Sequence, residues 1–191
     1  MEQERTRVML LPAARRDRAD FVAAMRASAD LHQPWISPPL DDDAFDAVLA
    51  RASGESFEFL LVRRRADGAI AGYFDVSQII RGPLQSAFLG YGGVAALSGQ
   101  GYMSEGLRLL LRYAFAELRL HRLEANIQPG NQRSLALVHR AGFVREGFSE
   151  RYLKIGGHWR DHERWAIRAE QWQEGAGRER YARTEWSSES A

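Results

Sequence analysis

The sequence predicts an α/β fold, a single domain built on a mixed, mostly antiparallel sheet of about seven strands with helices on both faces. Three observations predict it. The length of 191 residues suits one domain. The hydrophobic pattern changes from helical spacing to strand-like runs near residue 57, where a three-stranded meander begins. A strand, a glycine loop, a helix and another strand then follow, which is the order of a crossover between two parallel strands.

The first part of the chain predicts one strand and two helices. Val8–Pro12 is a short apolar run that a proline stops, as in a buried strand. Apolar residues at helical spacing beneath a charged face predict a helix over Arg15–Ser28. A loop with several prolines, Gln33–Pro39, separates it from a second short helix, Asp41–Ala52. The acids at the start of that helix suit the positive end of its dipole.

The middle of the chain predicts an antiparallel meander. Phe57–Arg64 and Ala69–Ile80 are strand-like runs joined by the turn Ala66-Asp67-Gly68. A second turn, Arg81-Gly82-Pro83, leads into the strand Gln85–Ala95. The last two strands are rich in Phe, Tyr, Ile and Val, as half-buried strands are.

The remaining elements begin after the loop Leu97–Met103, which opens directly into a helix with apolar residues repeating at i, i+3 and i+4. The elements predicted beyond it are a strand (His121–Ile127), a short helix (Asn131–Arg140) and a hairpin (Val144–Ile155 and Trp159–Arg168). We expect the domain to cover residues 1–172 and the polar stretch 173–191 to be a poorly ordered tail.

The composition excludes several classes of protein and site. The sequence has no cysteine, which excludes disulfides, thiolate zinc sites, iron–sulfur clusters and a cysteine nucleophile. Its 26 basic and 25 acidic residues give a net charge of +1, which argues against nucleic acid as a partner. We see no signal peptide, no membrane helix and no metal-ligand spacing among the five histidines. We therefore expect a cytoplasmic protein without a metal site or a membrane partner.

A glycine loop stands where a strand ends and a long helix begins. Gly99 and Gly101 allow successive main-chain N–H groups to approach one point, next to the positive end of the helix dipole. That arrangement suits a phosphate or pyrophosphate, and a tight turn that simply needs glycine is the alternative. The spacing fits neither a Rossmann loop nor a Walker loop.

Five short motifs in the second half of the chain occur in the order and at the spacing of a known superfamily. They are Leu89-Gly90-Tyr91, Gly99–Glu105, Asn131–Ser134, Ala141-Gly142-Phe143 with Glu146-Gly147, and Tyr152–His162. On these motifs the segment Leu89 to Ile167 resembles the GNAT superfamily of acyl-CoA-dependent N-acyltransferases. Within it, the segment most closely resembles the ribosomal-protein alanine N-terminal acetyltransferase branch. The resemblance implies a single-domain GNAT fold.

The resemblance also implies acetyl-CoA as cofactor. The pyrophosphate would lie on the main-chain amides of the glycine loop, namely Gly99, Gln100, Gly101, Tyr102, Met103 and Ser104. Pantetheine would pair with the backbone of Gly93, Val94 and Ala95, and Asn131 and Ser134 would contact its arm. Ser98 stands where the superfamily usually carries Arg or Gln, which leaves one polar contact to the phosphates fewer.

Acetyl transfer from a thioester to an amine has three requirements: a neutral amine, donors for the oxyanion and a proton for the departing thiolate. An α-amino group has a pKa of about 7.7–8.0, so a protein N-terminus needs only a modest base. Val94 or Ala95 would supply the main-chain oxyanion donor. Ser134 resembles the serine that protonates the thiolate in the alanine-acetylating branch, while Val138 stands where many relatives have Tyr. Helix capping or packing is the alternative role for Ser134.

The sequence does not identify the general base. Many relatives carry Glu where Asn126 stands, and Glu124 shares a face with Asn126 two residues earlier on the same strand. We interpret Glu124 as a candidate base, with a solvated strand carboxylate as the alternative. Asn126 would instead position a water.

We expect aromatic side chains and one acidic side chain to line the acceptor site. Trp35, Tyr152 and Trp159 are candidate walls, with core packing as the alternative for each. Asp75 would attract a substrate ammonium group.

The hypothesis is therefore an acetyl-CoA-dependent N-acetyltransferase whose acceptor is a protein N-terminus, of the ribosomal-protein alanine type. Two alternatives are a small amine acceptor, such as a polyamine, amino acid or antibiotic, and a CoA-binding regulatory module without turnover. Because the sequence has no thiol, the amine would attack directly in a ternary complex. The sequence does not distinguish a monomer from a homodimer.

Overall fold

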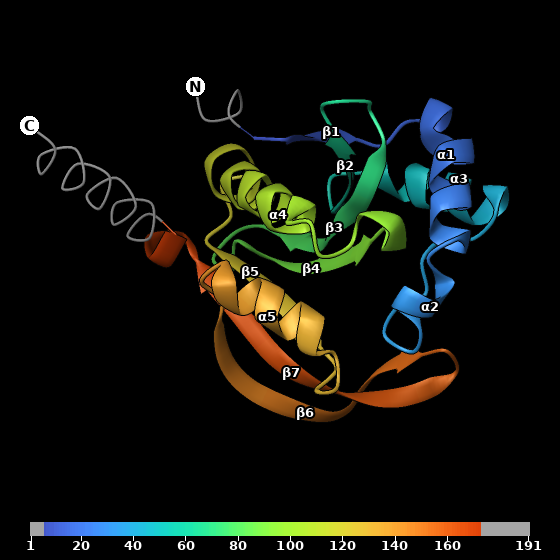
Figure 1. The fold of residues 1–191 in the computed structure, drawn as a ribbon. Helices are drawn as coiled ribbons and strands as arrows, with labels where there is room; N and C mark the ends of the chain where they lie inside the picture. The colour runs from blue at the N-terminus through green and yellow to red at the C-terminus, as the bar shows by residue number, and fades with distance from the viewer. Residues whose placement is uncertain (1–5, 173–191) are drawn as a thin grey trace, which may run out of the picture.

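The computed structural model describes residues 6–172, and Figure 1 shows a single sheet with helices on both of its faces. Neighbouring strands of the sheet follow the order β1-β2-β3-β4-β5-β7-β6. The strands are β1 (Val8–Pro12), β2 (Phe57–Arg64), β3 (Ile70–Ile80), β4 (Ser86–Gly93), β5 (Arg122–Ile127), β6 (Val144–Ile155) and β7 (His158–Arg168). Among them β4 and β5 run parallel, and all other neighbours are antiparallel. The predicted mixed, mostly antiparallel sheet of seven strands is confirmed.

Helices cover both faces of the sheet, as predicted. They are α1 (Arg18–Arg26), α2 (Ala29–His32), α3 (Asp42–Ala52), α4 (Tyr102–Arg112) and α5 (Gln132–Arg140). On one face, Phe21 of α1 and Phe45 of α3 pack against Phe59 of β2, with ring centroids 5.5 and 6.1 Å apart. On the other face lie α4 and α5 (Figure 1). We call these the α1–α3 face and the α4–α5 face.

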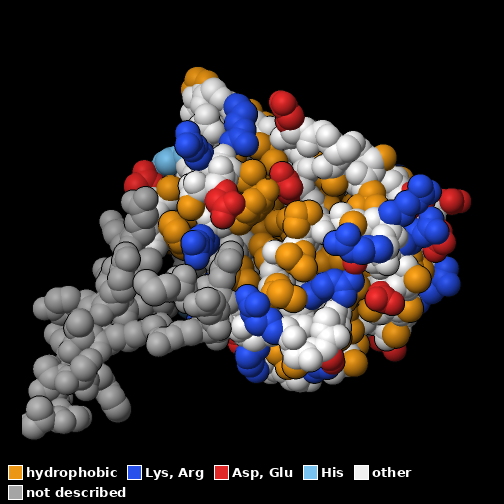
Figure 2. Space-filling view, turned by 90° about the horizontal axis from the view of Figure 1, so that it is seen from above, with side chains coloured by type: hydrophobic (Ala, Val, Ile, Leu, Met, Phe, Trp, Pro, Cys, Tyr) orange, Lys and Arg blue, Asp and Glu red, His pale blue; other side chains and the backbone are white. Residues whose placement is uncertain are grey.

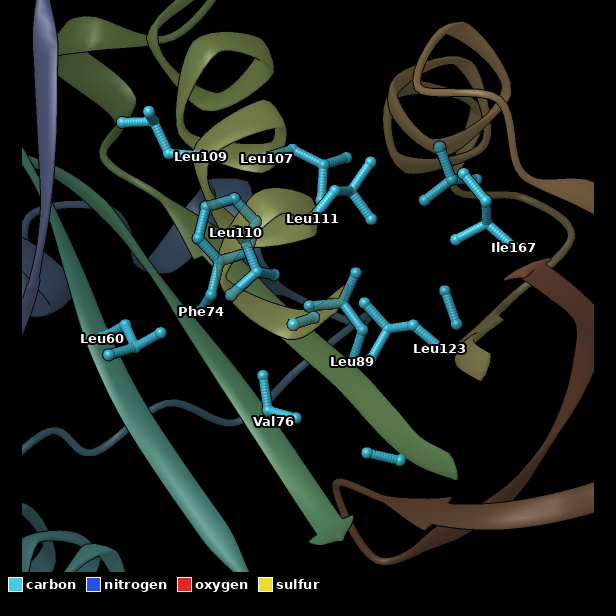
Figure 3. Close-up of a cluster of buried hydrophobic side chains, with 14 of the residues drawn as sticks. Leu60, Phe74, Val76, Leu89, Leu107, Leu109, Leu110, Leu111, Leu123 and Ile167 are labelled. Atoms are coloured by element: carbon cyan, nitrogen blue, oxygen red, sulfur yellow. The ribbon is translucent and has the colours of Figure 1, made fainter. Parts of the chain in front are cut away.

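The core under α4 explains why this helix lies on the sheet. Leu107, Leu110 and Leu111 of α4 point toward Phe74 and Leu123 of the sheet (Figure 3). Burial of each such side chain contributes roughly 1.5–3 kcal/mol. Because side chains alternate along a strand, the neighbours of these core residues point to the α1–α3 face.

Tertiary contacts divide the helix that the sequence predicts over Arg15–Ser28. A 3₁₀ turn (Arg15–Asp17) precedes α1, and α2 follows as a separate turn. Ser28 lies between α1 and α2, where its hydroxyl donates to the Ala24 carbonyl at 2.7 Å and accepts from the Ala95 amide at 2.9 Å. This contact across the molecule links the end of α1 to the loop after β4.

Two further boundaries differ from the prediction. The strand predicted over Gln85–Ala95 ends at Gly93, and a 3₁₀ turn (Ala95–Leu97) follows it. After α4 the chain continues as a π-helical turn, Tyr113–Glu117. The predicted tail, 173–191, lies outside the described residues. No helix in the described part of the chain is long and apolar enough to cross a membrane.

Candidate active site

A gap opens in the middle of the sheet between the two parallel strands. Strand β4 pairs with β5 only along residues 86–88 and 122–124, and the pairing stops beyond them. On the other side of β4, the Val94 amide donates to the Ala71 carbonyl at 2.9 Å. Hydrogen-bonded and non-bonded pairs alternate in an antiparallel ladder. The main-chain groups of Leu89, Tyr91 and Gly93 therefore point away from β3, toward the gap.

A cavity of about 390 Å³ lies at this gap. It brings together six of the residues that the sequence singled out, namely Trp35, Asp75, Asn126, Asn131, Ser134 and Tyr152. Asp75 comes from the α1–α3 face, because it alternates with the core residues Phe74 and Val76. Ser134 comes from α5, on the opposite face. The cavity is therefore lined from both faces of the sheet.

Asp75 lies over a glycine of the neighbouring strand. It pairs with Gly90 in the β3–β4 register, and a Cβ on Gly90 would lie 2.3 Å from Asp75 Oδ2. The absence of a side chain at Gly90 is what leaves room for the carboxylate. Burial raises the pKa of Asp75 to about 6, and the charge of Arg51 opposes that rise only in part.

Asn126 and Asn131 bring amide groups to the cavity. Asn126 Oδ1 is buried and has no hydrogen-bond partner among the described residues. Such an atom is stabilised when a ligand or water donates to it. Asn131 caps α5, with its Oδ1 accepting from the Ser134 amide at 3.2 Å. Because Oδ1 makes the cap, the Asn131 side-chain NH₂ is the group that remains for a ligand.

Ser134 and Tyr91 meet where α5 approaches β4. The Tyr91 hydroxyl donates to the main-chain carbonyl of Ser134 at 3.3 Å. Burial raises the pKa of Tyr91 well above its usual range. The Ser134 hydroxyl is not needed for the α5 cap, which Asn131 makes. Ser134 lines the cavity, and its side chain also bonds the Tyr91 hydroxyl.

Three further side chains shape the cavity wall. The Gln128 amide donates to the carbonyls of Pro34 and Trp35 at 3.2 and 3.1 Å, which fixes the loop that carries Trp35. The Tyr152 ring lies edge-on to His162, with centroids 6.0 Å apart. No local pattern marks Gln128, because its contacts are 94 and 93 residues away along the chain.

His162 also lines the cavity, although the sequence did not single it out as a site residue. Its Nδ1 lies 2.9 Å from the Arg160 carbonyl, so Nδ1 carries the hydrogen and Nε2 is the acceptor. Burial lowers the pKa of His162, which keeps the ring neutral near pH 7. Strand alternation alone does not reveal which face of β7 meets the cavity.

The glycine loop has the geometry of an anion site. Gly99 and Gly101 have φ values of +76° and +85°, and a Cβ on Gly99 would meet no atom within 4 Å. The first main-chain bond of α4 runs from the Glu105 amide to the Gly101 carbonyl. The amides of residues 101–104 therefore have no acceptor within the helix. They form the positive end of the helix, beside the open position at Gly99 and the guanidinium of Arg7, which fits a phosphate.

Arg7 lies over the same loop, a contact that the sequence did not predict. Its Nη2 donates to the Gln100 carbonyl at 2.9 Å, and its Nε donates to Glu105 Oε1 at 2.7 Å. It also lies over the Tyr102 ring, 4.8 Å from the centroid. Nothing in the local sequence marks Arg7, because these partners are more than ninety residues away.

The structure corrects the expected roles of Val94 and Ala95. The Val94 amide donates to the Ala71 carbonyl and the Ala95 amide to Ser28 Oγ, each at 2.9 Å, so neither is free to meet an oxyanion or pantetheine. The carbonyl of Gly93 likewise accepts from His32 Nε2 at 2.8 Å. The gap opens earlier on β4, at Leu89 and Tyr91.

Glu124 and Trp159 also lie away from the cavity. Glu124 accepts from Arg122 Nε at 2.8 Å, and the same guanidinium binds Glu146. Trp159 lies next to the β6–β7 turn, paired with Lys154, and is 61% exposed. Within residues 6–172, no group of three or more His, Asp or Glu side chains could hold a metal ion.

The chain is similar to known acetyltransferases. A family model for the acetyltransferase (GNAT) domain matches residues 7–144. A probable N-acetyltransferase of Bacillus subtilis, YjcK, is 45% identical over 102 residues, which are 53% of this chain and 56% of that protein. The ribosomal protein uS5-alanine N-acetyltransferase of Escherichia coli is 38% identical over 106 residues, 56% of this chain and 55% of that protein. These alignments span about half the length of each relative.

A solved structure extends the similarity to most of the fold. Mycobacterium smegmatis RimJ in complex with CoA-disulfide matches with a TM-score of 0.79 at 29% identity, over 86% of this chain and 83% of that one. The family match includes the glycine loop, both strands of the gap and α5. The chain therefore belongs to the acetyltransferase (GNAT) domain family.

Proposed function

We propose that this protein is an acetyl-CoA-dependent N-acetyltransferase whose acceptor is the N-terminal α-amino group of a protein, of the ribosomal-protein alanine type. The observation that carries this proposal is the cavity at the β4–β5 gap, with Asp75 on one face of the sheet and Ser134 on the other. Two reactants that enter from opposite faces would meet there. Acetyl-CoA would supply the acetyl group as a thioester.

Residues on the α4–α5 side would bind the CoA portion. The amides of residues 101–104, with Gly99 and Gln100, would bind the pyrophosphate. The main-chain groups of Leu89 and Tyr91 face the gap and would pair with the pantetheine arm, which the Asn131 NH₂ would also contact. The Ser134 hydroxyl would donate the proton that the departing sulfur requires.

The charge of the cavity favours a single amine over a polyamine. Among the described residues that line it, Asp75 is the only carboxylate, and none is Lys or Arg. A polyamine carries several positive charges and is best matched by several acids. One buried carboxylate matches one ammonium group, as at a peptide N-terminus. The rim residues Trp35 and Tyr152 would contact the residues that follow the first one.

The proposal is tested by the release of CoA thiol from acetyl-CoA with a panel of acceptors. The panel contains peptides that begin with Ala, the same peptides with an acetylated N-terminus, spermidine and free amino acids. We expect the highest kcat/KM for the free Ala peptides and no turnover with their blocked forms. Turnover confined to spermidine or amino acids would support the small-amine alternative. Binding of acetyl-CoA without turnover on any acceptor would contradict the proposal.

A further inference from the structure

Three residues form a row across the gap, on the α1–α3 face of the sheet. Asp75 of β3 pairs with Gly90 of β4. Phe88 and Glu124 are the last pair of the parallel register, so Gly90 and Asn126 of β5 are each two residues beyond it, on the two sides of the gap. Because Leu89 and Ala125 belong to the core under α4 and α5, their strand neighbours Gly90 and Asn126 are on the other face. Asp75 is on that same face.

The middle position of the row has no side chain. A Cβ on Gly90 would overlap Asp75 Oδ2, so the Asp75 carboxylate can lie over this position only because it is glycine. The carboxylate lines the cavity from β3, and the buried Asn126 Oδ1, which has no partner among the described residues, lines it from β5. Both groups are hydrogen-bond acceptors and both line the cavity. An ammonium group or amine is the ligand that can donate to both.

We propose that Asp75 and Asn126, on either side of Gly90, form the subsite for the acceptor's amino group, and that the Asp75 carboxylate takes up a proton from it. This inference rests on the proposed function. The acceptor ammonium loses two protons in the overall reaction as its N–C bond forms and the C–S bond of the thioester breaks. One proton leaves to solvent through Asp75, and the other is matched by protonation of the departing sulfur.

The charges around Asp75 are compatible with this role. Arg51 of α3 is the cation whose field acts on it, and Tyr73 is the nearest titratable neighbour on its own strand. From the other side of the cavity, His162 of β7 is neutral near pH 7. Arg164, opposite Asn126 on β7, is close to Gly147 of β6. With a pKa of about 6, Asp75 is ionised at pH 7.5 and able to accept a proton.

The test compares four forms of the full chain: wild type, Asp75→Asn, His162→Gln and Glu58→Gln. Steady-state kcat/KM for a lysine-free peptide beginning with Ala is measured between pH 5.5 and 9 with saturating acetyl-CoA. We expect Asp75→Asn to lower kcat/KM about 100-fold and to remove the limb near pH 6, because it abolishes the proton acceptor. His162→Gln should retain that limb. The inference would be overturned if His162→Gln lost the change in kcat/KM near pH 6. It would also be overturned if Asp75→Asn kept that change together with the wild-type kcat/KM.

Glu58→Gln is the matched control. Burial also raises the pKa of Glu58, but this carboxylate is on β2, bonds Tyr113 and lies outside the cavity. We expect it to keep wild-type activity and pH dependence, whereas a loss equal to that of Asp75→Asn would overturn a specific role for Asp75. Thermal melts of all four forms identify any variant that does not fold.

A binding measurement separates failure of the inference from failure of the proposed function. The affinity of the same peptide for the CoA-bound protein is measured by calorimetry for wild type, Asp75→Asn and Asn126→Ala. Weaker peptide binding in both variants supports the subsite, whether or not the wild type turns over. Absence of turnover in the wild type would count only against acetyl transfer. Equal affinity in all three forms, or no binding to the wild type, would overturn the subsite.

Discussion

At the residue scale, Asp75 is a carboxylate held where water stabilises it poorly. No ion pair joins it to a cation among residues 6–172, and burial outweighs the field of Arg51. The folded protein therefore binds its proton more tightly than the unfolded chain does. As the pH rises from about 4 to 6, ionisation of Asp75 therefore lowers the free energy of unfolding, and the whole of this loss of stability is present above pH 6.

Asp75→Asn is accordingly expected to stabilise the fold at alkaline pH while it impairs function. Removal of the buried charge should raise the free energy of unfolding at pH 8 by about 1–3 kcal/mol, with a smaller gain at pH 5. Urea unfolding at the two pH values measures this. A loss of stability at pH 8, or a gain that does not depend on pH, would show that the environment of Asp75 is misassigned.

Ser134→Ala tests the proposed proton donor. The α5 cap is made by the Asn131 side chain to the Ser134 main-chain amide, so removal of the hydroxyl leaves the helix cap in place. We expect kcat to fall about 100-fold while calorimetric affinity for acetyl-CoA stays near wild type. Ser53→Ala, which removes a hydroxyl at the end of α3, is the control. An unchanged kcat in Ser134→Ala would rule out the acid role.

At the scale of elements, the loop before α4 combines conformation and charge. Both glycines in it are left-handed, and the first-turn amides of α4 have no acceptors within the helix. Arg7 connects the start of the chain to this loop through Gln100 and Glu105. Tertiary contacts thus hold the start of α4 in place, while its first amides have no acceptor within the helix.

Gly101→Glu should abolish binding of acetyl-CoA. It places a carboxylate beside the proposed phosphate site, and it forces a side chain onto a residue with φ of +85°. Gly82→Glu is the matched control, because Gly82 has φ of +68° in an open turn between β3 and β4. Calorimetry should detect no acetyl-CoA binding in the first variant and wild-type affinity in the second. Retained affinity in Gly101→Glu would remove the phosphate assignment.

Elements that depend on local pattern could be predicted from the sequence, whereas boundaries that depend on distant contacts could not. The apolar repeat of α4 and the turns of the β2–β3–β4 meander are local signals, and both elements are present as predicted. The end of α1 is bridged by Ser28 to Ala95, a contact across 67 residues that no local pattern reveals. The same contact engages the Ala95 amide, and His32 engages the Gly93 carbonyl, at the end of β4.

At the scale of the whole molecule, the cavity results from the topology. One parallel pair in an otherwise antiparallel sheet separates after three residues on each strand and leaves a gap lined from both faces. The sequence predicted the sheet and six of the residues that line the cavity, three of which (Asn131, Ser134 and Tyr152) lie in the spaced motifs. It did not predict the hydrogen bond between Glu124 and Arg122, nor the position of His162 in the cavity wall. Both depend on how β5, β6 and β7 pack.

The face of the molecule seen in Figure 2 carries charges of both signs. In Figure 2, basic, acidic and hydrophobic side chains are interspersed on the face shown, in keeping with the net charge of +1. No charge of one sign dominates that face. Selection of the acceptor is therefore expected to occur at the cavity, through Asp75 and the aromatic rim.

Mass spectrometry of the product shows directly whether the protein transfers acetyl to an α-amino group. The protein is incubated with acetyl-CoA and a peptide that has an N-terminal Ala and an internal Lys, and the modified atom is located by fragmentation. We predict one added acetyl group, on the α-amino nitrogen, and its addition about 100-fold more slowly with Asp75→Asn under the same conditions. An acetyl group on the lysine side chain instead, or an unmodified peptide despite bound acetyl-CoA, would contradict the account.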